Sequence, residues 1–240
     1  MQPMHTVSAY DDELKYLARR IASMGGHAER MVEQAITALV SADTRLAQKV
    51  VRDDPILDES QRDIDEKAVS VIARRQPMAR DLREVIGAIR ISADLERIGD
   101  LAKNVAKRVV AATEGQQPVS LFRGIEALAD LALSQLKEVL DVYASREVTK
   151  LGFIRDHDDD IDAMYTSLFR ELLTYMMEDP RNITPCTHLL FCAKNVERIG
   201  DHATNIAETI YHIVTGEQMA NERPKGDKTD RVTASLLLPK

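Results

Sequence analysis

Apolar residues recur at helical spacing along most of the chain, and no stretch alternates apolar and polar residues as a strand would. Glycine and proline interrupt this pattern at intervals and mark the expected ends of helices. The pattern therefore predicts an all-α protein. The expected helices span about residues 11–41, 44–52, 56–75 and 81–113, then 121–143, 147–155, 158–177 and 187–215.

Three glycines and one short segment indicate where these helices are weak or end. Gly25 and Gly26 lie inside the first long helix, where glycine lowers helix stability, so a weak point is expected there. Gly216 follows the last apolar position, where glycine suits the left-handed turn that ends many helices. Residues 114–118 read EGQQP and form the expected linker between the two halves of the chain.

A sequence repeat defines these two halves. Residues 94–104 read DLERIGDLAKN and residues 195–205 read NVERIGDHATN, at an offset of 101 residues. Repetition of this kind indicates a duplicated structural unit. We therefore predict two tandem three-helix bundles related by internal duplication, over residues 8–114 and 118–216, followed by a disordered polar tail at residues 217–240.

The composition restricts the partners and the location of the protein. The chain lacks tryptophan, so its cores must be aliphatic, and its net charge of −7 argues against nucleic acid and anionic membranes as main partners. No apolar run approaches the ~20 residues that cross a bilayer, and no secretory leader is recognised, so a cytoplasmic protein without membrane insertion is expected. Cys186 and Cys192 match no zinc or redox spacing and are expected to be buried free thiols in a reducing compartment.

Pairs of carboxylates recur in both halves. In each pair the two acidic residues are four positions apart, so they share one face of a helix. On a helical wheel, the pairs within the repeated segment point away from the apolar stripe. The preceding long helix of each half carries a matching pair. The four pairs are Glu59 with Asp63, Glu96 with Asp100, Asp156 with Asp160, and Glu197 with Asp201.

Helical hairpin geometry predicts that the pairs of each half lie at one height. In an antiparallel hairpin two positions are level when their midpoint lies at the turn, and the midpoints fall near the breaks at residues 77–80 and 178–181. Like charges 4 Å apart repel by about 4 kcal/mol at an effective dielectric constant of about 20. Protons, arginines or a metal ion would relieve this repulsion. All-oxygen ligation favours Mg²⁺, Mn²⁺, Fe or Ca²⁺ over Zn²⁺.

Two other interpretations of the acidic pairs stay open at this point. Outward acidic residues are commonly solvated, and Arg97 and Arg198 would serve as counter-charges in a helical scaffold without metal. A carboxylate-bridged metalloenzyme would place its ligands in the bundle core with Glu-x-x-His motifs, and this chain contains none. His202, beside Asp201, is expected to pack at the edge of the core rather than to bind a ligand.

The twin ERIGD segments, together with ARRQP at residues 73–77 and LTYMMED at residues 173–179, resemble the PhoU family of accessory regulators of bacterial phosphate transport. The resemblance covers about residues 11–216. It implies two three-helix bundles whose surfaces bind multinuclear metal clusters, with the eight carboxylates given above as ligands. Aspartate instead of glutamate at position 156 shortens one side chain, and Asp94 corresponds to Asn195, so the two sites need not be equivalent.

The resemblance also implies a function without catalysis. The protein would repress the phosphate-starvation response and restrain phosphate uptake by binding a phosphate-sensing histidine kinase and the ATPase subunit of the transporter. Bound Mg²⁺, Mn²⁺ or iron, including ferric iron, would be its cofactor. Nine methionines on an acidic pair of bundles suggest adaptable contacts, and a homodimer is expected. The candidate partner-binding residues are Arg97, Arg198, Asn104 and Asn205.

Overall fold

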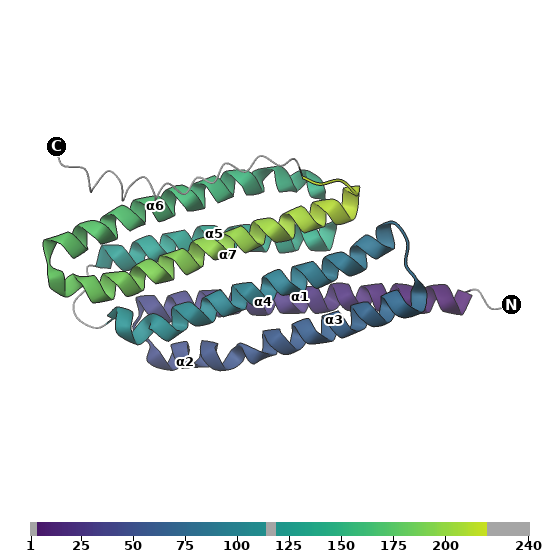
Figure 1. Cartoon of the computed structure of the whole chain (residues 1–240), viewed down its shortest axis with the longest axis horizontal. Coiled ribbons are helices and arrows are strands. Elements are labelled where there is room, and N and C mark those ends of the chain that lie inside the picture. The colour runs from purple at the N-terminus through teal and green to yellow at the C-terminus, as the bar shows by residue number, and fades with distance from the viewer. Residues whose placement is uncertain (1–3, 114–118, 220–240) are drawn as a thin grey trace.

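The computed structural model describes residues 4–113 and 119–219, and these form helices with short connections and no strands, as predicted (Figure 1). The predicted linker at 114–118 and residues 220–240 of the predicted tail lie outside the described residues. The elements are α1 (Met4–Val40), α2 (Thr44–Asp53), α3 (Pro55–Arg75), α4 (Arg80–Thr113), α5 (Val119–Ser145), η1 (Val148–Phe153), α6 (Ile154–Glu178), η2 (Pro180–Asn182) and α7 (Ile183–Thr215).

Local sequence signals explain where helices begin and end. Asp43 caps α2, because its carboxylate accepts hydrogen bonds from the backbone N–H groups of Arg45 and Leu46 at 2.9 and 3.0 Å. A cap of this kind contributes about 1 kcal/mol to stability. Gly216 ends α7 with a φ of 81°, and its N–H donates to the carbonyl of His212 at 2.9 Å. The predicted C-terminal turn is therefore confirmed.

Several helix boundaries differ from those expected, since α1 begins at Met4 and α6 at Ile154 instead of about residues 11 and 158. The helix expected at 147–155 is the 3-10 segment η1, which leads directly into α6. Helix α7 begins at Ile183, before the expected residue 187, because Pro185 lies in its first turn, where the missing N–H costs no hydrogen bond. Helix α1 runs without a break through Gly25. A Cβ atom there would lie 2.7 Å from Cδ2 of Leu140, so this glycine lets α5 approach closely.

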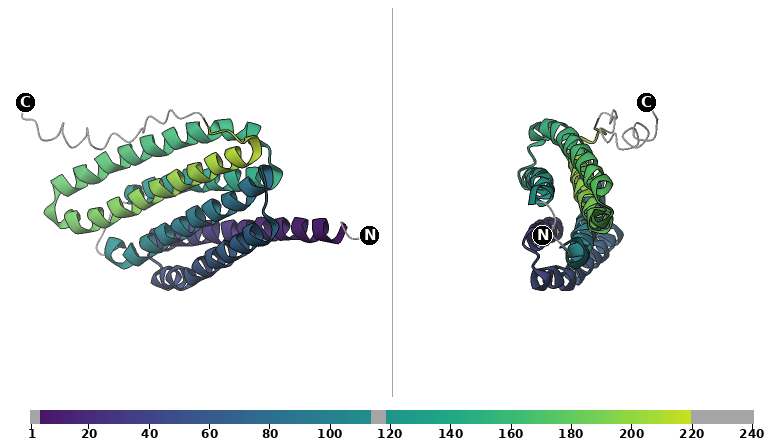
Figure 2. Two further views of the ribbon diagram at one scale, coloured as in Figure 1. Left: turned by 45° about the vertical axis from the view of Figure 1, so that its right-hand side comes forward. Right: turned by 90° about the vertical axis from the view of Figure 1, so that its left-hand side faces the viewer.

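The two bundles lie side by side and meet along α4 and α7, which share the most extensive contact in the described fold (Figures 1 and 2). We call this contact the seam. Helices α3, α4, α7 and α6 form one layer, and α1 and α5 lie in a second layer behind it (Figure 2). At the seam, a side chain at Gly87 of α4 would overlap Ile213 of α7. The seam therefore lies along the two helices that carry the repeated segment.

The core of the described residues is mainly aliphatic, as the lack of tryptophan predicts, and it also includes the buried rings of Tyr143 and Tyr165. Cys186 and Cys192 are buried free thiols, as predicted. Burial raises the pKa of the Cys192 thiol to about 12, so this thiol is unreactive near neutral pH. No helix within the described ranges combines the length and the apolar character that a bilayer span needs.

Candidate functional site

The predicted metal ligands form two sets, one in each bundle, which we call the first and second acidic faces. Among the side chains that the structure describes, no three His, Cys, Asp or Glu groups are placed to hold one metal ion. The side chain of Asp156 lies outside the described residues. The first acidic face comprises Glu59 and Asp63 of α3 with Glu96 and Asp100 of α4, and the second comprises Asp156 and Asp160 of α6 with Glu197 and Asp201 of α7.

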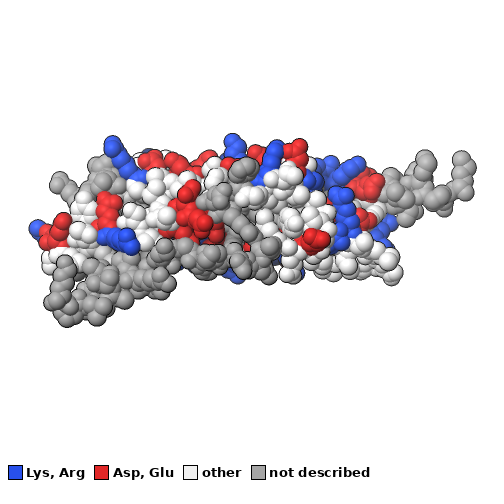
Figure 3. All heavy atoms as spheres, turned by 90° about the horizontal axis from the view of Figure 1, so that it is seen from above, with Lys and Arg blue, Asp and Glu red and all other residues white. Residues whose placement is uncertain are grey.

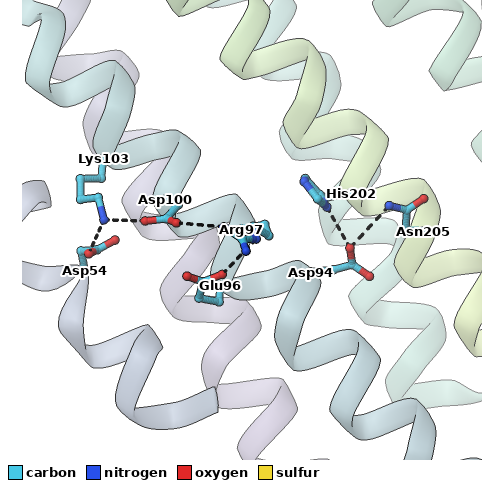
Figure 4. Close-up of polar contacts among 8 residues, drawn as sticks. All are labelled: Asp54, Asp94, Glu96, Arg97, Asp100, Lys103, His202 and Asn205. Atoms are coloured by element: carbon cyan, nitrogen blue, oxygen red, sulfur yellow. Dashed lines mark hydrogen bonds and ion pairs between the residues drawn. The ribbon is translucent and has the colours of Figure 1, made fainter. Parts of the chain in front are cut away.

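Glu96 and Asp100 lie together on α4, as their spacing predicts (Figure 4). Arg97 contacts both, since its Nε lies 3.6 Å from Oε2 of Glu96 and its Nη1 lies 3.6 Å from Oδ2 of Asp100. Burial raises the pKa of Glu96, and the charge of Asp100 raises it further. The two carboxylates are therefore half-buried neighbours whose mutual repulsion Arg97 reduces.

Lys103 binds the other carboxylate oxygen of Asp100, the one that Arg97 does not contact. Its ammonium group donates to Oδ1 of Asp100 at 2.5 Å and to Oδ2 of Asp54, at the start of α3, at 2.6 Å (Figure 4). Burial opposes the charge of this ammonium, but the hydrogen bonds from it to Asp100 and Asp54 outweigh that effect and raise the pKa of Lys103. The spacing of Lys103 and Asp100 was visible in the sequence, but no local rule relates Lys103 to Asp54.

Glu59 and Asp63, the carboxylates that α3 contributes to the first face, do not join Glu96 and Asp100. Asp63 accepts hydrogen bonds on Oδ2 from the hydroxyl of Tyr16 at 2.8 Å and from Nε of Arg20 at 2.7 Å, both on α1. The hydrogen bond with Asp63 is the main cause that raises the pKa of Tyr16. Glu59 is exposed. Asp63 therefore links α3 to α1 in this structure instead of joining the carboxylates of α4.

In the second face, Glu197 is buried, with 5% of its surface exposed. The outward orientation expected for it was wrong, because α6 packs against this side of α7 and places Ile161 against Gly200. Nζ of Lys194 lies 2.8 Å from Oε1 of Glu197, while Oε2 has no hydrogen-bond partner within the described structure. Burial raises the pKa of Glu197 to about 7, and Asp201 contributes in the same direction against the lowering effect of Lys194.

A chain of hydrogen-bonded polar groups, two of them buried, connects α5, α7 and α6 in the second bundle. Nε2 of Gln135, on α5, donates to the hydroxyl of Thr204 at 2.8 Å, and that hydroxyl lies 3.0 Å from Oδ1 of Asp158 on α6. Gln135 is completely buried, and its Oε1 has no partner within the described structure. Of the remaining predicted ligands, Asp201 is half-buried and Asp160 is exposed. The second bundle therefore holds buried oxygen acceptors that lack hydrogen-bond donors.

The seam contains a polar contact that the sequence did not predict. Nδ1 of His202 lies 2.8 Å from Oδ1 of Asp94 across the seam, and the amide of Asn205 reaches the same oxygen at 3.5 Å (Figure 4). His202 therefore packs between the bundles and makes a hydrogen bond there. A groove of about 610 Å³ opens beside these residues and is also lined by Arg90 and His212.

The candidate partner-binding residues differ in accessibility. Arg97, Arg198 and Asn104 are exposed, whereas Asn205 is half-buried in the seam. On the face that Figure 3 shows, acidic side chains gather in separate clusters with lysine and arginine between them. This visible surface alternates in charge and is not uniformly acidic.

Comparison with known protein families matches both bundles. The model of the PhoU domain matches residues 21–109 and again residues 125–210, one match in each bundle. A Rhizobium meliloti (strain 1021) protein named phosphate-specific transport system accessory protein PhoU homolog is 67% identical over 229 residues, which cover 95% of this chain and 97% of that protein. A homolog of the same name from Caulobacter vibrioides (strain NA1000 / CB15N) is 49% identical over 93% of this chain and 97% of that protein.

Solved structures show the same fold. The crystal structure of PhoU from Pseudomonas aeruginosa superposes with a TM-score of 0.80 at 37% identity, covering 87% of this chain and 100% of that one. The phosphate transport system regulatory protein PhoU from Streptococcus pneumoniae gives a TM-score of 0.81 at 28% identity, covering 88% of this chain and 99% of that one. The match over both bundles confirms the predicted tandem architecture.

Proposed function

Because the chain belongs to the PhoU family, we propose that it is the cytosolic accessory protein of a phosphate-specific transport system and represses the phosphate-starvation response when phosphate is plentiful. The observation that carries this proposal is the 67% identity to a protein of that name over nearly the full length of both chains. Its role is non-catalytic, since the similar proteins are named as accessory proteins.

In this proposal the protein acts by contact with two partners. It binds the ATPase subunit of the transporter and thereby restrains uptake, and it binds the phosphate-sensing histidine kinase and keeps it from signalling starvation. Exposed polar residues support such contacts: the side chain of Arg97 is 63% exposed, and Arg198 and Asn104 are also exposed. Homodimers of the protein would exchange with these complexes.

The proposal also includes metal binding at the acidic faces. The donors are carboxylate oxygens, which suit Mg²⁺, Mn²⁺ and iron, and Oε2 of Glu197 is a buried acceptor without a hydrogen-bond partner in the described structure. A bound cation would supply the positive charge that offsets repulsion among the carboxylates. Asp160 and Asp201 would approach it from α6 and α7.

Recovery of partners from cells tests the regulatory proposal. Tagged wild-type protein, expressed in its own cells at high phosphate, is expected to recover the transporter ATPase and the sensor kinase. The double variant Glu96→Gln/Asp100→Asn is expected to recover less of at least one partner, because it removes two charges from the first face. The matched control is Glu126→Gln/Asp130→Asn, which removes two exposed carboxylates four residues apart on α5, outside both acidic faces.

Two washes separate the kinds of contact. A direct ionic contact weakens in salt, because the Debye length falls from about 10 Å at 0.1 M to about 3 Å at 1 M. A contact bridged by metal is lost in chelator instead. Deletion of the gene is expected to leave phosphate-regulated genes on in rich phosphate. If wild-type protein recovers neither partner and the deletion leaves those genes off, the regulatory proposal is wrong.

A further inference from the structure

The exposed residues of α4 and α7 differ in charge from the chain as a whole, which is acidic. Every acidic residue of these two helices is half-buried or buried in the described structure. Several are paired with cations inside the fold, as Glu84 is with Arg146 and Glu197 is with Lys194. The exposed side of the two helices consists instead of apolar, amide and basic residues, which we call the seam strip: Leu82, Ile86, Arg90, Arg97, Asn104 and Lys107 of α4, with Ile183, Phe191 and Arg198 of α7.

The whole seam strip lies on one side of the molecule. At 100° per residue, its members on α4 fall within about 100° of one another, and those on α7 within about 80°. Helices α1 and α5 pack against α4 and α7 from the second layer (Figure 2). The seam strip therefore faces away from that layer and runs along both sides of the seam.

Large apolar side chains are exposed at both ends of the seam strip. The first end consists of Leu82 and Ile86, and the second end consists of Ile183 and Phe191. The guanidinium carbon of Arg108 lies 4.3 Å from the centroid of the Phe191 ring, so this ring is held in an exposed position. Exposed apolar groups beside arginines are typical of the surfaces with which proteins bind other proteins.

The first and second ends lie at opposite ends of the seam, because α4 and α7 run antiparallel. Asp94 of α4 lies against His202 of α7, and Arg108, 14 residues later, lies against His188, 14 residues earlier. The two ERIGD segments are therefore nearly level with each other, at the centre between the two ends.

The repeat places the same kind of residue on each side of this centre. Arg97 and Arg198 lie near the centre, and both are exposed. Leu82 and Ile183 each precede their arginine by 15 residues, which is about 22 Å of helix, in opposite directions. The seam strip thus has an approximate twofold axis, with cations near the axis and one apolar end on each side.

We infer that the seam strip docks a partner that is itself a twofold-symmetric dimer, so that one copy of this chain contacts both partner subunits. The partner surface is acidic opposite Arg97 and Arg198, and each of its subunits has an apolar recess for one end of the strip. Identical subunits present identical sites about their axis, and the duplicated ends match two such sites. The inference rests on the regulatory proposal and gives the surface and stoichiometry of one of its two partners.

A second copy of this chain and a membrane fit the seam strip less well. A second copy stacked about the same axis would place Arg97 and Arg198 opposite the same two arginines, and like charges in contact repel. An anionic membrane surface would repel a chain with a net charge of −7. An acidic partner dimer has neither conflict.

Light scattering of purified complexes tests the stoichiometry. The full-length protein is mixed with the purified ATPase subunit of the transporter and, separately, with the purified sensor kinase. With the partner that docks on the seam strip, the complex is expected to contain one copy of this chain for two partner subunits. Its affinity is expected to fall as salt is raised from about 0.1 M to about 1 M, because the charges near the axis are then screened.

Substitutions at each end test whether both ends are used. The first-end variant is Leu82→Asp/Ile86→Asp, and the second-end variant is Ile183→Asp/Phe191→Asp. Each is expected to weaken binding by about a hundredfold or more, because one of two linked contacts is lost. The two sets together are expected to abolish binding. Serine at the same four positions repeats the test without added charge.

The matched control is Val40→Asp/Val69→Asp. It places two aspartates on valines that are 38% and 62% exposed on α1 and α3, outside the seam strip. Its affinity for either partner is expected to equal that of the wild type. Circular dichroism and thermal melting check that each variant is folded.

Different outcomes overturn the inference and the regulatory proposal. Equal binding by wild type and folded end variants, or one partner subunit per chain, refutes the twofold docking and leaves the regulatory proposal standing. The inference is also wrong if the end variants dissolve a homodimer of this chain, or abolish its binding to vesicles of phosphatidylserine and phosphatidylcholine. Failure of the wild type to bind either purified partner removes the regulatory proposal and the inference together.

Discussion

Single residues determine how the shared acidic motif behaves in each bundle. Glu96 and Glu197 occupy equivalent positions, yet Glu96 is half-buried beside Arg97, whereas Glu197 is buried under α6. A helical wheel places both on the side opposite their own apolar stripe. It does not show which neighbouring helix covers that side. The difference in burial arises from packing between helices, and burial raises the pKa of Glu197 to about 7.

Burial of Glu197 predicts a pH dependence of stability in chelator-treated protein. Its pKa is about 7 when folded and 4.5 ordinarily, so the folded state favours the protonated carboxyl. The stabilisation is fully present below pH 4.5 and is lost as the pH rises through 7, by up to about 3 kcal/mol. Glu197→Gln is therefore expected to reduce the loss of stability between pH 5 and pH 8, measured by denaturant unfolding.

Glu59→Gln is the control for this measurement, because Glu59 is an exposed carboxylate on the other acidic face. Its unfolding free energy should follow the pH in the same way as that of the wild type. An unchanged pH dependence in Glu197→Gln would show that Glu197 ionises normally in the folded protein.

At the scale of elements, glycine at the centre of each ERIGD segment permits close helix packing. A Cβ atom at Gly99 would overlap Leu57 of α3, and one at Gly200 would lie 2.9 Å from Cδ1 of Ile161 on α6. The two glycines therefore set the approach of α4 to α3 and of α7 to α6. Close helix packing therefore explains the glycine in the middle of each motif without reference to any ligand.

Gly99→Ala is expected to destabilise the protein by about 1–3 kcal/mol, because the added methyl group must displace Leu57. Alanine favours helices by about 1 kcal/mol over glycine, so the overlap must outweigh this gain. At Gly26 the nearest group is the flexible end of Arg30, at 3.5 Å from the added Cβ atom. Gly26→Ala is thus expected to leave stability unchanged or to raise it. Equal thermal shifts in the two variants would contradict the packing role of Gly99.

The sequence predicted the elements well and the side-chain contacts between helices poorly. Apolar periodicity and the breaks near residues 77–80 and 178–181 gave the long helices, because these signals are local. Arg20 lies 43 residues from its partner Asp63, and Lys103 lies 49 residues from its partner Asp54. No periodicity specifies such pairs. The carboxylate pairs and the counter-charge at Arg97 were found from the sequence, whereas the partners of Asp63 and the contact of Lys103 with Asp54 required the packed structure.

At the scale of the whole molecule, the seam couples the two bundles. Asp94 and His202 join α4 to α7 beside the two acidic faces, each within a few residues of a predicted ligand. No sequence pattern indicates this contact, because the apolar periodicity and the repeat concern each bundle separately. Because α4 and α7 are packed against each other at the seam, a shift of α7 would displace the side chains of α4 that contact it.

A double-mutant cycle measures the strength of this coupling. Asp94→Ala and His202→Ala are each expected to destabilise the protein, and their combined effect should fall short of the sum by about 1 kcal/mol. Asn205→Ala and Asn104→Ala form a matched pair at equivalent positions of the repeat. The first alters a seam residue and the second an exposed one, so only Asn205→Ala should couple to Asp94→Ala. Strict additivity of Asp94→Ala and His202→Ala would show that the seam contact contributes nothing.

The position of α7 as the last helix of the described fold has a consequence for synthesis of the protein. Helix α4 contacts α7 along the seam, so the side of α4 that includes Gly87 stays uncovered until α7 has left the ribosome. The first bundle can fold earlier from its own contacts, but it does so with one apolar face exposed to the cell. Chains that end before residue 183 would keep that face permanently open to aggregation and to proteases.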